Sequence, residues 1–112
     1  MVCSYTYWES SMRGWTGRLV WRETGFRIKA PCASPIIAEY SQIDLITLYK
    51  KFGYQHRVCV LYKDQSATQK YIYLLLSNKQ IRKFLVRMIE HNVTLCVRYY
   101  SSADDFPKNC NG

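Results

Sequence analysis

Residues 78–91 read NKQIRKFLVRMIEH, and this stretch decides the fold that the sequence predicts. Its apolar residues recur with the period of an amphipathic helix. The predicted apolar face carries Ile81, Phe84, Leu85, Met88 and Ile89. Ser77 is a good N-cap, Gln80 completes a capping box with it, and Asn92 suits a left-handed helix stop. The sequence therefore predicts one helix that turns its apolar face toward the rest of the chain.

Runs with a period of two precede this helix, which is typical of β-strands. Residues 15–22 and 26–30 alternate around the turn Glu23-Thr24-Gly25 and predict a hairpin. Further strands are predicted at residues 4–8, 36–40, 43–49, 57–63 and 71–76, with a last short run at 94–100. This order predicts a mainly β, α+β fold, in which one C-terminal amphipathic helix caps a bent antiparallel sheet or barrel of seven strands. Residues 1–100 would form a single domain, and residues 101–112 a flexible polar tail.

Composition narrows the class of protein. The chain has 112 residues, enough for one domain, and a formal net charge of +8. Such a charge favours an anionic partner: a nucleic acid, a membrane surface or an acidic peptide. The five cysteines are odd in number and show no CxxC spacing, and the N-terminus lacks a signal-peptide pattern. We therefore read the cysteines as reduced thiols and expect an intracellular protein, cytoplasmic or nuclear.

The sequence offers little for catalysis or metal binding. His56 and His91 are the only histidines, and no Cys or His spacing matches a zinc site. The acidic residues are scattered, apart from Asp104 and Asp105 in the predicted tail, where a fixed acid–base geometry is not expected. We therefore predict no catalytic residues, no metal and no cofactor.

Two stretches carry a family resemblance. Residues 43–51 (IDLITLYKK) are similar to the fifth strand of the pleckstrin-homology superfold and its basic exit. Residues 71–95 (YIYLLLSNKQIRKFLVRMIEHNVTL) resemble the last strand and closing helix of that superfold, most of all in the third lobe of FERM domains. The resemblance implies that a ligand adds as an extra strand beside the fifth strand, in a groove against the helix.

That resemblance implies a non-enzymatic, adaptor-like module, which binds a protein or peptide between strand 43–49 and helix 77–91. The side chains expected near this groove are Leu45, Thr47, Tyr49, Phe84 and Met88. Helical spacing alone favours Phe84 and Met88 as core residues. A free edge strand would also permit a homo- or hetero-oligomer.

Basic residues support an alternative function, which is binding to nucleic acid, phosphoinositide or a membrane surface. The anion-binding candidates are Arg18, Arg22, Arg27 and Lys29 on the predicted hairpin, Lys50 and Lys51 in a later turn, and Arg82, Lys83 and Arg87 on the polar stripe of the helix. Tyr71 and Tyr73 could add stacking surfaces for bases. The same charges also fit an ordinary solvated face.

Overall fold

The computed structural model describes residues 1–6, 15–29, 34–52 and 55–98, with the side chains of residues 50–52 outside the description. Its elements are β1 (Val2–Thr6), β2 (Trp15–Arg22), β3 (Gly25–Lys29), β4 (Ile36–Glu39), the 3₁₀ turn η1 (Tyr40–Gln42), β5 (Ile43–Phe52), β6 (Gln55–Lys63), β7 (Gln69–Ser77), α1 (Asn78–Glu90) and β8 (Leu95–Val97). The predicted tail at 101–112 lies outside the described residues.

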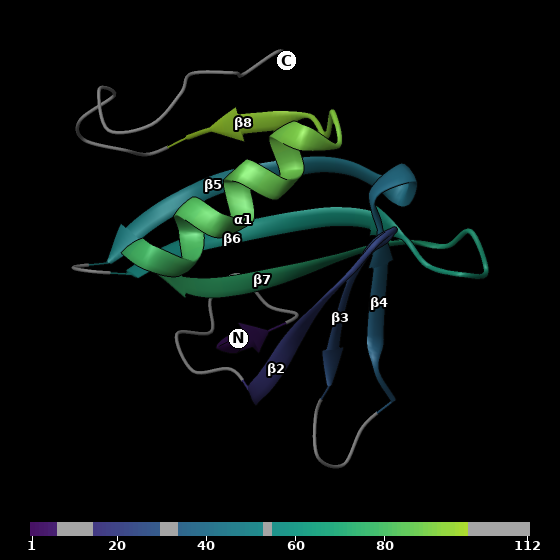
Figure 1. Ribbon diagram of the computed structural model, residues 1–112, viewed down its shortest axis with the longest axis horizontal. Helices are drawn as coiled ribbons and strands as arrows, with labels where there is room; N and C mark the ends of the chain where they lie inside the picture. Colours follow the sequence, from purple (N-terminus) through teal and green to yellow (C-terminus); the bar gives the residue numbers. More distant parts are fainter. Residues whose placement is uncertain (7–14, 30–33, 53–54, 99–112) are drawn as a thin grey trace.

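All eight strands belong to one sheet, which curls into an open half-barrel around α1 (Figure 1). The strand order is β4-β3-β2-β1-β7-β6-β5-β8. Two antiparallel meanders, β1–β4 and β5–β7, are joined where β1 pairs with β7. The last strand, β8, pairs in parallel with β5.

The predicted mainly β fold with a single helix is confirmed. The predicted count of seven strands is wrong, and the helix is not clearly C-terminal. The reason is that the chain returns to the sheet after α1 and adds Leu95–Val97 beside β5.

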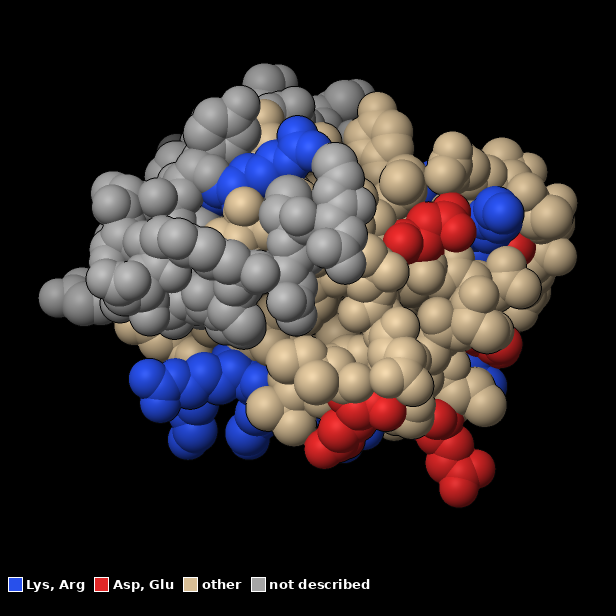
Figure 2. Space-filling model, turned by 90° about the horizontal axis from the view of Figure 1, so that it is seen from above, with Lys and Arg blue, Asp and Glu red and all other residues tan. Residues whose placement is uncertain are grey.

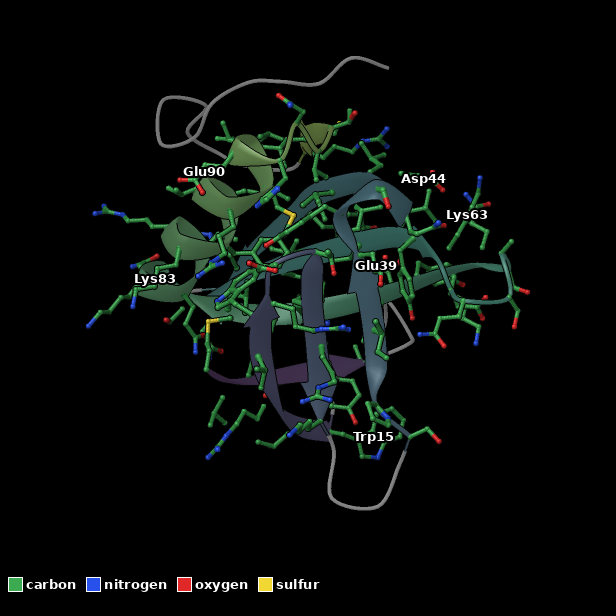
Figure 3. The ribbon with its side chains drawn as sticks, turned by 45° about the vertical axis from the view of Figure 1, so that its right-hand side comes forward. Trp15, Glu39, Asp44, Lys63, Lys83 and Glu90 are labelled. Atoms are coloured by element: carbon green, nitrogen blue, oxygen red, sulfur yellow. The ribbon has the colours of Figure 1, made fainter. Side chains whose placement is uncertain are left out.

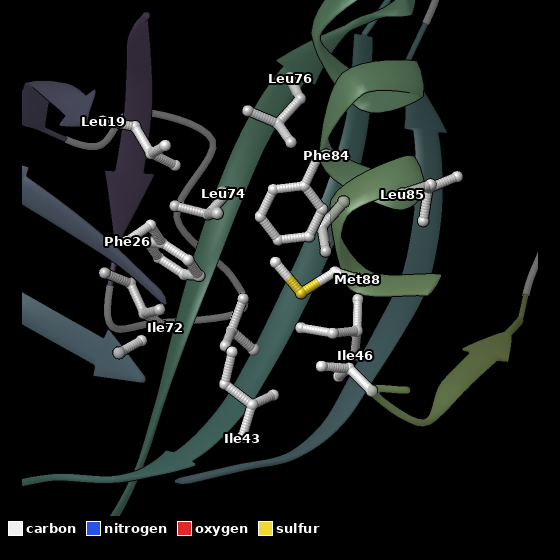
Figure 4. Close-up of a cluster of buried hydrophobic side chains, with 14 of the residues drawn as sticks. Leu19, Phe26, Ile43, Ile46, Ile72, Leu74, Leu76, Phe84, Leu85 and Met88 are labelled. Atoms are coloured by element: carbon white, nitrogen blue, oxygen red, sulfur yellow. The ribbon is translucent and has the colours of Figure 1, made fainter. Parts of the chain in front are cut away.

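The core lies between the inner face of the sheet and α1 (Figure 4). Ile81, Phe84, Leu85 and Met88 are buried, as the helical spacing predicts. Ile89 is the exception, because half of its surface is exposed. At 3.6 residues per turn, Ile89 lies about 80° around the helix from Ile81, at the border of the buried arc.

Both ends of α1 confirm their predicted signals. The Gln80 N–H donates to Ser77 Oγ at 3.2 Å, and the Ser77 N–H donates to Gln80 Oε1 at 2.9 Å. Asn92 has a φ of 58°, the left-handed conformation that ends a helix. Gln80 Nε2 also donates to the Val2 carbonyl at 2.7 Å, which ties the first turn of the helix to β1.

The cysteines differ from the sequence-based interpretation. Neither Cys3 nor Cys59 forms a disulfide, and burial raises the pKa of the Cys3 thiol to about 11. Cys96, however, is disulfide-bonded. The interpretation of all five cysteines as reduced thiols is therefore wrong. The cysteines consequently give no support for an intracellular location.

The helix content bears on membrane association. Within the described ranges, α1 is the only α-helix, and it spans 13 residues. A helix needs about 20 apolar residues to cross a bilayer. No helix in this part of the chain is long and apolar enough to do so.

Candidate binding groove along the helix

The edge of β5, where the sequence predicts an added ligand strand, is paired with β8. The Ile46 N–H donates to the Thr94 carbonyl at 2.9 Å, and the Arg98 N–H donates to the Leu48 carbonyl at 2.9 Å. Because β8 uses these backbone groups, a ligand strand can add at this position only by displacing β8.

The five residues predicted near that groove do not converge on one surface. Leu45, Thr47 and Tyr49 are half-buried and alternate with Ile46 and Leu48, which face the core. The first three side chains therefore point to the outer face of the sheet, where the Tyr49 ring contacts Tyr73. Two further residues, Phe84 and Met88, have no exposed surface and pack on the inner face.

Four of the predicted anion-binding residues share the outer face of β2 and β3. Arg18, Arg22, Arg27 and Lys29 alternate with side chains that point into the core. Arg18 lies directly opposite Lys29 in the ladder. Like charges in opposed positions destabilise a strand pair unless an anion lies between them. The remaining candidates on the sheet, Lys50 and Lys51, have side chains outside the description.

The other predicted cations line a groove along α1. Lys79, Arg82, Lys83 and Arg87 form its basic wall, and Met1, Trp21 and Val86 supply apolar surface. Gln80 and Glu90 complete the lining, and the groove has a volume of about 870 Å³. We call this feature the helix groove. Figure 2 shows Lys and Arg side chains gathered at the end of the molecule where α1 begins, and Figure 3 labels Lys83 and Glu90 on the helix.

The floor of the helix groove is held by the start of β1 and by β2. The Met1 amino group donates to the Leu19 carbonyl at 3.1 Å, and the Leu19 N–H donates back to the Met1 carbonyl at 2.7 Å. Trp21, on the same strand as Leu19, points to the inner face. Its ring centroid lies 5.8 Å from those of both Phe26 and Phe84.

These contacts fix the apolar floor against the core, while three of the four cations project toward solvent. Lys79, Arg82 and Lys83 are exposed, and Arg87 is half-buried against Trp21. The sequence predicts the cation stripe of the helix. It does not predict that this stripe meets Trp21, because that depends on how α1 crosses the sheet.

A second, smaller hollow of about 320 Å³ lies between the start of β4 and the β6–β7 loop. Asp64 and Lys70 line it and form a salt bridge of 3.1 Å with each other. Since its acidic and basic groups pair internally, this hollow has no uncompensated charge pattern comparable with that of the helix groove.

Metal ligands and histidines give no further site. Among the residues that the structure describes, no three His, Cys, Asp or Glu side chains gather closely enough to hold a metal ion. His56 is buried and shares a hydrogen bond with the Asn78 side chain, beside the N-terminus of α1. His91 stacks on Tyr40, with ring centroids 3.7 Å apart. Both histidines thus make structural contacts.

The helix groove therefore combines a row of four cations with a fixed apolar floor that contains an aromatic ring. Such a surface can pair with carboxylates and pack against one apolar side chain at the same time. Comparison with known proteins adds no family to this description: no protein-family model matches the chain, and no curated protein matches its sequence.

Proposed function

We propose that the protein is a non-enzymatic interaction module, which binds an acidic peptide segment of a protein partner in the helix groove. The observation that carries this proposal is the meeting of four helix cations with the apolar floor at Trp21. The volume of the groove lies in the range typical of binding pockets, about 300–1,000 Å³. A segment with carboxylates around one apolar side chain complements both parts of the surface.

The spacing of the cations supports an anionic occupant. Lys79, Lys83 and Arg87 follow one another at four-residue intervals, so they form like-charge pairs along one face of α1. Each such pair destabilises a helix by roughly 0.2–0.5 kcal/mol. Glu90 is the one acidic side chain in the lining of the groove. Carboxylates from a partner would relieve this repulsion, and Arg82 and Arg87 can bind them in the bidentate mode.

The concave shape favours a peptide over a flat surface. A partner side chain that enters the groove can pack against Trp21 and Val86, which a duplex or a planar lipid surface cannot reach equally well. The proposal leaves the pairing of β5 with β8 intact. It therefore keeps the expected class of partner, a protein or peptide, and moves the proposed site to the basic side of the helix.

The test uses a fluorescent 12-residue peptide of Asp and Glu with one central Phe, measured by fluorescence anisotropy. Lys83→Glu should weaken binding tenfold or more. Lys63→Glu is the matched control, because it makes the same charge change at an exposed position on the far side of the molecule (Figure 3). Replacing the peptide Phe by Ser should also weaken binding, because the apolar floor loses its partner.

Two results would contradict the proposal. Equal weakening by Lys63→Glu and Lys83→Glu would show that the probe senses only net charge. Unchanged binding of the Ser peptide would show that the apolar floor takes no part.

A second candidate function is nucleic-acid binding by Arg18, Arg22, Arg27 and Lys29. It is favoured by the opposed pair Arg18 and Lys29 on the exposed face of the β2–β3 hairpin. A 20-nucleotide single-stranded RNA should then bind with a log–log salt slope of about −0.7 per neutralised phosphate. Arg18→Glu should make this salt dependence less steep, because fewer phosphates are neutralised, whereas Lys83→Glu should leave it unchanged. A salt-independent affinity, or adhesion to anionic vesicles in place of RNA, would count against this candidate.

The relation to the pleckstrin-homology superfold is also a proposal. It is supported by two antiparallel meanders followed by a helix across the open side of the sheet. The strand β8 after the helix is the feature that departs from the expected pattern. A crystal structure compared with members of that superfold would decide the relation.

A further inference from the structure

We propose that two copies of this chain pair antiparallel along the outer edge of β4, so that their sheets join into one continuous sheet. Ile37 of each copy would lie opposite Glu39 of the other, with Ala38 at the two-fold axis. This interface is separate from the helix groove, whose lining contains no residue of β4. The inference therefore goes beyond the proposed function and does not rest on it.

The outer edge of β4 carries unpaired backbone groups. β4 ends the order of the sheet, and β3 is its neighbour there (Figure 1). The Tyr40 N–H donates to the Thr24 carbonyl at 2.8 Å, so Ala38, two residues earlier, also directs its backbone groups toward β3. The N–H and C=O groups of Ile37 and Glu39 therefore point away from the sheet. Within the described part of the chain, these groups have no hydrogen-bond partner.

Antiparallel self-pairing satisfies these groups. With Ile37 opposite Glu39 of the second copy, each of the two pairs exchanges both of its N–H···O bonds. Ala38 then lies opposite its own copy in the closely spaced pair without hydrogen bonds, where a small side chain fits. Because the same residues meet from both sides, the contact closes at two copies.

The side chains at this edge lack partners of opposite charge. Arg27 lies opposite Ile37 in the β3–β4 ladder, and its Nε atom is buried with no hydrogen-bond partner among the described residues. Glu39, which Figure 3 labels on β4, does not cap η1 and forms no ion pair in the described part of the chain. Both side chains point to the outer face, because they alternate with the buried Phe26 and Ala38.

The two-fold axis brings these unpaired charges together. Arg27, Ile37 and Glu39 of the second copy lie in one row across the joined sheet. Two strand spacings, about 10 Å, then separate the Cα atoms of Arg27 and that Glu39. Their side chains can meet over Ile37, and the carboxylate supplies the acceptor that the buried Nε lacks. The symmetry repeats this ion pair, so the edge of β4 is complementary to itself, which favours a second copy over an unrelated strand.

The test measures the mass of the full chain by sedimentation velocity from about 10 μM to about 1 mM, because so short an edge predicts a weak dimer. The mass should rise from 13.3 kDa toward twice that value and stop there. Glu39→Arg and Arg27→Glu should each weaken dimerisation tenfold or more. Lys83→Glu is the matched control, because it makes the same charge change on α1, and it should stay within a factor of two of wild type.

A mixture of the two charge variants separates contacts between copies from contacts within one copy. When Glu39→Arg and Arg27→Glu are mixed in equal amounts, every Arg meets a carboxylate of the other copy, so the dimer should return. A mixture that stays monomeric would overturn the inference. So would a wild-type chain that is monomeric at about 1 mM, which would leave the edge to a strand of another protein. Growth beyond two copies would overturn the closed pairing.

A backbone variant tests the same edge without a change of charge. Ile37→Pro removes an outward N–H and leaves the hydrogen bonds to β3 in place, a position at which edge strands tolerate proline. It should weaken dimerisation tenfold or more, whereas Ile37→Val, which keeps the N–H, should not. Thermal unfolding of the monomer checks that each variant is folded. Equal dimerisation of the folded Pro and Val variants would show that copies associate through another surface.

Discussion

The guanidinium group of Arg87 lies over the indole ring of Trp21, with its Cζ atom 4.7 Å from the ring centroid. This contact joins the last turn of α1 to the inner face of β2. Cation–π pairs contribute about 0.5–1 kcal/mol at exposed sites and more when shielded from water. We expect Arg87→Gln to lower the free energy of unfolding by about 1 kcal/mol. Arg82→Gln, on the exposed side of the same helix, should stay within about 0.5 kcal/mol of wild type in denaturant titrations.

The intrinsic fluorescence of the chain gives this prediction a second readout. Trp21 should change its emission when Arg87 is replaced, because the charge above its ring is removed. Identical emission and stability for Arg87→Gln and Arg82→Gln would contradict a role for the contact.

Phe84 packs the helix against the sheet. It has no exposed surface, and its ring contacts both Phe26 and Trp21. Phe84→Ala should lower the free energy of unfolding by about 3–5 kcal/mol, because it leaves a cavity in the core. Val86→Ala is the control on the same helix, since 53% of Val86 is exposed. Comparable losses for both variants in urea titrations would contradict the observed orientation of α1.

Gly25 allows β3 and β4 to approach closely. A Cβ atom at this position would lie 2.1 Å from the Ala38 carbonyl oxygen and 2.6 Å from the Glu39 Cα, so the backbone of β4 would have to move. At Gly17 the nearest atoms, at 2.8 Å, belong to the side chains of Ile28 and Tyr5. Overpacking typically costs about 1–3 kcal/mol, and we expect Gly25→Ala to lie at or above the top of that range. In thermal unfolding, Gly17→Ala should lower the melting temperature less than Gly25→Ala does. The reverse order would argue against the observed register of β3 and β4.

The loop between β6 and β7 should respond to acid. The pKa of Asp64 lies below its usual value of 3.8, chiefly because the Thr68 backbone N–H donates to its carboxylate, and Ser66 and Lys70 add to the effect. The ionised form is therefore favoured in the folded loop. This contribution is present above the unfolded pKa and is lost as the pH falls through the lowered folded value. The amide signals of Ser66 and Thr68 should shift together below pH 4, and Asp64→Asn should abolish that shared titration.

The parts of the fold that the sequence predicts are those with a local signal. The apolar residues of α1 lie within two or three turns of one another, and the capping box at Ser77 needs only Gln80, so both are visible in a short window. The hairpin of β2 and β3 is read from alternation around one turn in the same way. Ile89 marks the limit of this reasoning, because residues at the border of a helical face are buried or exposed according to what packs beside them.

The parts that the sequence does not predict depend on contacts between distant residues. β8 lies within the short run predicted at 94–100, but its parallel pairing with Ile46–Leu48 has no local signature. The helix groove is similar: its cations were expected on the polar stripe of the helix, but their meeting with Trp21 was not. That meeting depends on how α1 crosses the sheet, where Phe84 packs against Phe26 and Trp21.

The pairing of β8 with β5 has a consequence for synthesis on the ribosome. β5, β6, β7 and α1 all leave the exit tunnel before Leu95–Val97 does. Until then, the backbone groups of Ile46 and Leu48 have no strand beside them, and an open edge of this kind pairs readily with other chains. A nascent chain halted before Thr94 would thus expose a template for chaperones or for neighbouring nascent chains. Among the described elements, β8 is thus the last part of the sheet to be synthesised.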